Sequence, residues 1–273
     1  MELNFIKINP SGNTTVLILD PLPREVYSRV ASKVMKPTSL SAEQVGFVER
    51  ATLSGALGRL EMMGGEFCGN ASRGFAAWLT DRQDPGLSLN EGTTKVVVPI
   101  EVSGHQGILK ATVARERSDR RAYYVEISMP LPRWLRQKPD YTLVDFEGIV
   151  HAVVWGGTAS EARFQAIKKE VSRELGEVDC LGVMFYQEEV RQLTPVVYVR
   201  SVGSLVWESS CGSGSVAVAA ALAERERRSV KALNLAQPGG IIQADVEWQN
   251  HPVEARIGGD VIIEAGGVVY VDL

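Results

Sequence analysis

The alternation of apolar and polar residues predicts that strands make up most of this chain. Alternation with a period of two is typical of half-buried strands. We expect strands over residues 3–8, 15–19, 44–49, 59–62, 96–102, 107–114, 122–129, 181–186, 195–200, 205–208, 241–248 and 261–271. Residues 142–155 contain further strand material. Three prolines before it predict a crossover between two halves: Pro130, Pro132 and Pro139.

Four segments have the spacing or composition of helices instead. Residues 24–35 and 161–175 are predicted as helices. Residues 71–79 and 215–224 are apolar on most faces, which indicates helices buried on all sides. A buried helix of this kind must be surrounded by sheet.

These elements predict an α+β fold of two similar lobes. Each lobe is a curled, mostly antiparallel sheet around a central helix, with an active site in the cleft between the lobes. The first lobe is expected over residues 1–115, completed by the last strand at 261–273. The second is expected over residues 116–260.

Composition restricts the classes of function. A net charge of −4 argues against a nucleic-acid-binding surface. The chain has no run of 18 apolar residues, so we expect no membrane-spanning helix. The start of the chain lacks the charged and apolar regions of a signal peptide. Three cysteines are too few for a disulfide framework, so we expect thiols and a cytoplasmic protein.

Two short motifs match each other: Cys-Gly-Asn-Ala-Ser at 68–72 and Cys-Gly-Ser-Gly-Ser at 211–215. Each opens one of the two buried helices. A cysteine at a helix N-terminus lies at the positive end of the helix dipole, which favours the thiolate. The first backbone N–H groups of such a helix are donors suited to a carboxylate. Cys68 and Cys211 are therefore candidate catalytic bases for proton transfer to and from one carbon.

Other interpretations of these motifs are weaker. Taken singly, each cysteine would more often be a small buried residue, but their shared context favours catalysis. Residues 212–217 fit a dinucleotide fingerprint, but the following strand lacks the expected acidic residue. A serine-hydrolase elbow fails because Ser213 lacks glycine two positions before and after it.

Nothing in the sequence predicts a metal site. The three histidines, His105, His151 and His251, are scattered, with no paired ligand spacing. Glu208, beside Trp207, is a candidate to hold a substrate ammonium group. A carboxylate near a thiol raises the pKa of the thiol, so Glu208 could keep one cysteine protonated.

At these residues the chain resembles the diaminopimelate epimerase family of cofactor-independent racemases. That family carries one Cys-Gly-Asn motif, one Cys-Gly-Ser/Thr-Gly motif, an early Gly-Asn pair and a late Pro-Gly-Gly turn. The last two match residues 12–13 and 238–240. The chain departs from the epimerases at Ala71, and over residues 200–208, where they have a Glu-Arg-Gly-rich segment.

Where the chain departs from the epimerases, it resembles the histidine racemases of staphylopine-type opine metallophore biosynthesis. The matching stretches are residues 9–13, 43–47, 66–71 and 207–214. The resemblance implies interconversion of L- and D-histidine without pyridoxal phosphate, and a homodimer. It also implies substrate-facing roles for Glu43 and Glu208. The alternatives are a diaminopimelate epimerase or another amino-acid racemase of the same family, and a non-catalytic amino-acid-binding relative.

The expected mechanism uses both thiols and no cofactor or metal. One cysteine, as thiolate, removes the α-proton, and the other returns a proton to the opposite face. The partner is a small amino acid, with no nucleic acid and no membrane. The expected substrate-binding residues are Asn13, Glu43, Gln44, Gly69, Asn70, Glu208, Gly212 and Ser213. Gly69, Asn70, Gly212 and Ser213 would hold the carboxylate through their N–H groups.

Overall fold

The computed structural model describes residues 1–82, 95–115, 121–200 and 203–272. The chain divides into two compact units. The first comprises Met1–Ser128 and Gly258–Leu273, and the second comprises Met129–Ile257. The predicted α+β class, with two similar sheet-rich lobes and few helices, is confirmed.

Both expected lobe boundaries differ from those of the structure. The first unit extends to Ser128 rather than ending at residue 115, because β7 (Ala122–Ser128) pairs antiparallel with β6 (Leu109–Arg115). Residues 116–120, where the second lobe was expected to begin, lie outside the described residues. At the other end, residues 258–260 belong to the first unit, where Ser11 N donates to Asp260 O at 3.0 Å.

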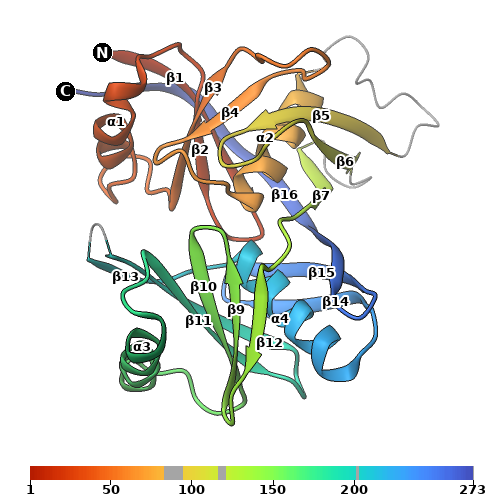
Figure 1. Ribbon diagram of the computed structural model, residues 1–273. Coiled ribbons are helices and arrows are strands. Elements are labelled where there is room, and N and C mark those ends of the chain that lie inside the picture. The colour runs from red at the N-terminus through yellow and green to blue at the C-terminus, as the bar shows by residue number, and fades with distance from the viewer. Residues whose placement is uncertain (83–94, 116–120, 201–202, 273) are drawn as a thin grey trace. The chain divides into compact units, whose positions relative to one another are not determined.

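The first unit is a sheet in the order β1-β2-β3-β4-β5-β6-β7-β16, and its described residues also form three helical segments. Its remaining strands are β1 (Glu2–Pro10), β2 (Thr15–Ile18), β3 (Gln44–Glu49), β4 (Arg59–Met62), β5 (Val96–Val102) and β16 (Pro252–Tyr270). Its helices are η1 (Arg24–Val26), α1 (Tyr27–Val34) and α2 (Gly69–Asp81). β16 also pairs with β1, which closes this sheet (Figure 1).

The helix α2 lies inside this closed sheet. It packs against β1, β2, β5, β6 and β7, and every residue from Gly69 to Thr80 is buried. The other face of β1, β2 and β3 is covered by α1, through a core that includes Val30 and Val34. The sheet is therefore buried on both faces, which explains why all four residues of β2 are buried.

The second unit repeats this succession of elements with two additional strands, β8 and β13. Its strands are β8 (Trp134–Gln137), β9 (Tyr141–Phe146), β10 (Ile149–Trp155), β11 (Cys180–Gln187), β12 (Gln192–Val199), β13 (Ser204–Trp207), β14 (Val230–Gln237) and β15 (Gly240–Trp248). Its helices are α3 (Glu161–Leu175) and α4 (Gly212–Glu226). The order β9-β10-β11-β12-β14-β15-β16 follows the order β1 to β7 of the first unit.

The strand directions and helices also correspond. Parallel pairs β2–β3 and β4–β5 in the first unit match parallel pairs β10–β11 and β12–β14 in the second. α3 covers one face of β10 and β11, and α4 packs against β9, β10, β11, β14 and β15 (Figure 1). The internal similarity inferred from two five-residue motifs is thus present in the topology of both units.

Three local features differ from the sequence-based expectation. The proline-containing stretch before residue 141 includes a strand, β8, paired with β9. The stretch 142–155 is a hairpin, because residues 147–148 turn the chain and Gly148 has a φ of +88°. β16 begins at Pro252, earlier than the expected 261. Among the described residues, no helix has both the length and the apolar composition needed to cross a membrane.

Candidate active site

Cys68 and Cys211 occupy the same position in their units: each is the N-cap of a buried helix. Their backbone angles nearly coincide, with φ −127° and ψ 109° at Cys68, and φ −127° and ψ 113° at Cys211. Each sulfur accepts a hydrogen bond from the N–H group three residues on, at 3.5 Å from Ala71 and 3.3 Å from Gly214. Cysteine here does what serine or aspartate usually does at an N-cap.

The serine that ends each motif has a structural role. Ser72 Oγ donates to the carbonyl oxygen of Cys68 at 2.8 Å, and Ser215 Oγ donates to that of Cys211 at 2.7 Å. Each serine lies four residues after its cysteine, one helical turn away. The repeated pattern Cys-Gly-x-x-Ser therefore fixes the carbonyl group of the cysteine as well as its thiol.

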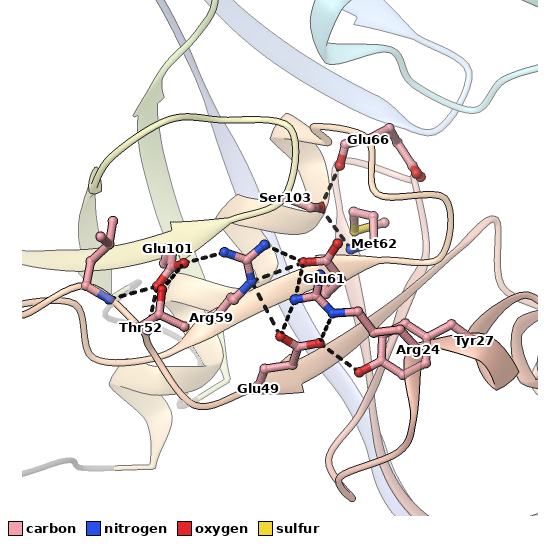
Figure 2. A network of polar contacts seen from close by, with 11 residues as sticks. Arg24, Tyr27, Glu49, Thr52, Arg59, Glu61, Met62, Glu66, Glu101 and Ser103 are labelled. Atoms are coloured by element: carbon pink, nitrogen blue, oxygen red, sulfur yellow. Dashed lines mark hydrogen bonds and ion pairs between the residues drawn. The ribbon is translucent and has the colours of Figure 1, made fainter.

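The turn after β5 supports the segment that leads into Cys68. Ser103 Oγ donates to the carbonyl oxygen of Glu66 at 2.7 Å and accepts from the N–H of Met62 at 2.9 Å (Figure 2). Gly104, with a φ of +66°, lies so close that a Cβ atom would be 2.3 Å from the nitrogen of Phe67. Only glycine fits this contact.

A network of ion pairs fixes the strands beneath this segment (Figure 2). Arg59 on β4 contacts Glu49, Glu61 and Glu101, and Arg24 contacts Glu49 and Glu61. Burial alone would raise the pKa of Glu101, but hydrogen bonds from the backbone and side chain of Thr52, with Arg59 and Leu53, lower it to about 2. Glu101 is therefore ionised at neutral pH, and the network links η1, β3, β4 and β5.

The corresponding turn after β14 supports Cys211. Gln237 Oε1 accepts from the N–H of Cys211 at 2.8 Å, and its Nε2 donates to Ser215 Oγ at 3.0 Å. The N–H of Gly239 donates to the carbonyl oxygen of Ser209 at 2.8 Å. The late Pro-Gly-Gly turn thus has a physical role, which is to position the residues before the second thiol.

A chain of three polar groups leads from the core of the second unit to the Cys211 thiol. His151 Nε2 lies 3.0 Å from Ser213 Oγ, which lies 3.6 Å from Cys211 Sγ. His151 is fully buried on β10, and burial lowers its pKa to about 3. The imidazole is therefore neutral at physiological pH. Ser213, which was expected to bind the substrate carboxylate through its N–H group, also contacts the Cys211 thiol through its hydroxyl group.

Glu208 and burial act together on Cys211. The thiol is buried, and its pKa is raised well above the usual value, first by burial and then by the negative charge of Glu208. Contacts from Ser213 and Gly214 act in the opposite direction without prevailing. The pKa of Cys180 is also raised, to about 12, by burial and by the charge of Glu208. Both thiols of this unit are protonated at neutral pH.

In the first unit, the structure brings Asn13 and Glu43 together. Asn13 Nδ2 donates to Glu43 Oε2 at 2.8 Å across thirty residues of sequence, and Asn13 Oδ1 is buried without a hydrogen-bond partner among the described residues. Gln44 begins β3, and its N–H donates to Thr14 O at 3.0 Å. The parallel pairing of β2 with β3 sets these residues side by side.

Arg73 joins that group to the start of α2. Its Nη2 donates to Asn70 Oδ1 at 2.8 Å and lies 3.3 Å from Ser11 Oγ, in the turn that also carries Asn13. Arg73 is fully buried. No sequence motif indicated a role for Arg73, Gln237 or Ser103. The only sequence signal for Arg73 is its charge within an otherwise largely apolar helix.

The expected residues divide between the two units. Asn13, Glu43, Gln44, Gly69 and Asn70 belong to the first unit with Cys68, and Glu208, Gly212 and Ser213 belong to the second unit with Cys211. Two helix N-termini with thiol caps and adjacent amide donors are chemically suited to proton transfer next to a carboxylate.

Comparison with known proteins identifies relatives over nearly the whole chain. The family described as "Histidine racemase CntK N-terminal domain" matches residues 2–270. A histidine racemase from Fusobacterium nucleatum is 35% identical, with 98% of this chain and 97% of that protein covered. A histidine racemase from Staphylococcus aureus strain Mu50 is 27% identical, with 99% and 98% covered.

The fold is shared with more distant enzymes. The crystal structure of a hydroxyproline epimerase from Agrobacterium vitis aligns with a TM-score of 0.64 at 12% identity, covering 98% of this chain and 92% of that one. At this identity the similarity concerns the fold alone.

Proposed function

Because the chain belongs to the histidine racemase CntK family, we propose that this racemase interconverts L- and D-histidine with two cysteine bases. The observation that carries the proposal is the matched pair of thiol N-caps, with nearly identical backbone angles, at Cys68 and Cys211. The names of the relatives support histidine as the substrate.

In the proposed reaction, one sulfur is a thiolate and the other a thiol. The thiolate takes the proton from Cα of the amino acid and becomes a thiol. The second thiol gives its proton to the opposite face of the same carbon and becomes a thiolate. Protons and charge balance without an oxidant or a cofactor, and the enzyme ends with the two protonation states exchanged.

The substrate carboxylate accepts hydrogen bonds from the first N–H groups of the two helices, those of Gly69, Asn70, Gly212 and Ser213. Charge that moves from Cα onto the carboxylate during deprotonation is stabilised there by the helix dipoles. The N–H groups of Ala71 and Gly214 donate to the cysteine sulfurs. This supports a first turn in which the earlier N–H groups bind the carboxylate and the next one binds the sulfur.

Glu43 and Glu208 bind the substrate ammonium group in this proposal. The charge of Glu208 has a second effect, because it adds to burial in raising the pKa of Cys211, which keeps this thiol protonated. Asn13 fixes one oxygen of Glu43, so its amide sets the orientation of that carboxylate.

The wider setting follows from the same proposal. Both cysteines must be reduced, which favours a cytoplasmic location. We propose that the D-histidine enters the biosynthesis of a staphylopine-like opine metallophore, and that the enzyme is a homodimer. Sedimentation velocity would test the dimer independently of the chemistry.

A substrate comparison tests the proposed function. Purified enzyme is assayed by chiral chromatography with L-histidine, LL-diaminopimelate and a panel of other amino acids at equal concentration. We expect racemisation of histidine to exceed that of the others by at least about tenfold. Preference for diaminopimelate, or binding of histidine without inversion, would overturn the assignment.

A further inference from the structure

The buried charge of Arg73 breaks the symmetry between two otherwise matched helix N-termini. Arg73 lies five residues after Cys68, and Val216 lies five residues after Cys211. Because the two N-caps have nearly the same backbone angles, these positions are equivalent. Both side chains are fully buried, but only the first carries a charge.

The side chain of Arg73 extends toward the Cys68 end of α2. Side chains on a helix lean toward its N-terminus, and residues three apart share one face. The hydrogen bond from Arg73 Nη2 to Asn70 Oδ1, at 2.8 Å, confirms this direction. The guanidinium is therefore placed against the first turn of α2, whose N-cap is the Cys68 thiol.

Arg73 lacks a full set of partners for a buried cation. Among the described residues, Nε and Nη1 have no hydrogen-bond partner, and no carboxylate lies within ion-pair distance of the group. Leaving a buried charge uncompensated costs several kcal/mol. A negative charge that forms nearby in the working enzyme would recover part of that cost.

The charged and titratable groups that act on Arg73 are few. Burial lowers the pKa of Arg73 to about 10, and the ionised forms of Tyr124 on β7, Cys68, and Asp260 on β16 act in the opposite direction. Arg73 therefore remains a cation at neutral pH. The electrostatic interaction between Arg73 and an ionised Cys68 is reciprocal, so the cation favours the thiolate over the thiol.

The surroundings of Cys211 have the opposite sign. Position 216 is apolar, and Glu208, three residues before Cys211, adds negative charge. The position three before Cys68 is Gly65, and the carboxylate of Glu66, two before Cys68, is exposed and accepts from the N–H of Gly64 at 2.9 Å. The helix of Cys68 thus contains a buried cation, whereas position 216 in the helix of Cys211 is apolar.

We propose that Arg73 is a positioning residue whose buried charge holds Cys68 as the thiolate, so that the resting enzyme has Cys68 as its base and Cys211 as its acid. The inference rests on the proposed two-thiol reaction and deepens it. The enantiomer whose α-proton faces Cys68 is then processed by the resting form. The other enantiomer requires the exchanged form, with Cys211 as thiolate.

The test measures the thiolate of Cys68 without substrate. The rate of alkylation by iodoacetamide is followed from pH 5 to 10, and the peptide that carries Cys68 is quantified by mass spectrometry. Wild type, Arg73→Met and Arg73→Lys are compared as full-length proteins. Circular dichroism first establishes that each variant is folded. The other charged or titratable residues of the first unit, among them Glu66, His105, Tyr124 and Asp260, are unchanged throughout.

We expect the alkylation midpoint of Arg73→Met to rise by at least about one pH unit, the usual effect of losing an opposite charge. The rate at pH 7 should fall about tenfold. Arg73→Lys keeps the charge and should stay within about threefold of wild type. Arg82→Met removes one cation from the exposed C-terminal end of the same helix and should leave the midpoint unchanged.

Two results would overturn the inference. One is a folded Arg73→Met protein with the wild-type midpoint. The other is a folded Arg73→Lys protein that behaves like Arg73→Met, because the charge would then not be the cause. Since no substrate is present, failure of this test differs from failure of the proposed function. The latter would appear as a wild-type enzyme that does not racemise histidine.

Discussion

The imidazole of His151 fills the space that Gly182 leaves open on the neighbouring strand. The two residues are register partners on β10 and β11, and a Cβ atom at position 182 would lie 2.1 Å from His151 Nδ1. Both atoms cannot occupy that space. Glycine at 182 is therefore what lets the ring reach Ser213 beside the Cys211 thiol.

Replacing Gly182 by alanine should displace His151 from Ser213. We expect a loss of about 1–3 kcal/mol in unfolding free energy, as for overpacked cores, together with a lower kcat. Urea unfolding and a racemisation assay measure the two effects. Gly267→Ala is the matched control, because a Cβ there meets Phe5 at an ordinary 3.7 Å. Equal stability of the two variants would contradict the close contact.

The neutral state of His151 gives stability a defined pH dependence. Its pKa is about 3 in the folded protein, against an ordinary value of 6.5. As the pH falls, the unfolded chain therefore binds a proton at His151 before the folded protein does. The stability that depends on the neutral ring is present above pH 6.5 and is lost as the pH falls toward 3. Denaturant unfolding from pH 7 to 4 should show a shallower pH slope in His151→Phe than in wild type.

A histidine elsewhere provides the comparison for that slope. His251 is exposed in the turn before β16, so His251→Asn should keep the wild-type slope. In NMR spectra, the ring protons of His151 should not titrate between pH 5 and 8. A titration of His151 near pH 6.5 would show that the ring is not held neutral.

The sequence predicted the two central helices and both thiols because each signal is local. An apolar run next to a Cys-Gly pair needs no knowledge of the rest of the chain. The pairing of Asn13 with Glu43 was different, since it depends on β2 lying parallel to β3. The role of Gln237 likewise depends on β14 ending beside the N-terminus of α4.

Two errors in the predicted fold have similar causes. The prolines at 130, 132 and 139 correctly predicted a crossover between the halves, since the second unit begins at Met129, but the strand β8 between them was missed because it pairs only with β9. The lobe boundary at residue 115 was placed too early because β7 completes its pairing with β6 only at Ser128. Strand partnership is long-range information that alternation does not contain.

Glu101 should control the acid stability of the protein. Its pKa is lowered from 4.5 to about 2, so its contribution is present above pH 4.5 and is lost as the pH falls from 4.5 to 2. Glu101→Gln should therefore be less stable than wild type at pH 7, with the difference shrinking toward pH 2. Thermal unfolding across this range measures it, with Glu25→Gln, an exposed site on η1, as the control. A constant difference at every pH would contradict the assigned role.

Proton exchange at Cα measures the two-thiol reaction most directly. L-Histidine is incubated in deuterated water with wild type, Cys68→Ser or Cys211→Ser, and the chirality and deuterium content of the product are recorded. We expect wild type to yield D-histidine with deuterium at Cα, and each single variant to lose racemisation. D-Histidine that keeps its original hydrogen, or full racemisation by either variant, would contradict proton transfer by two cysteines.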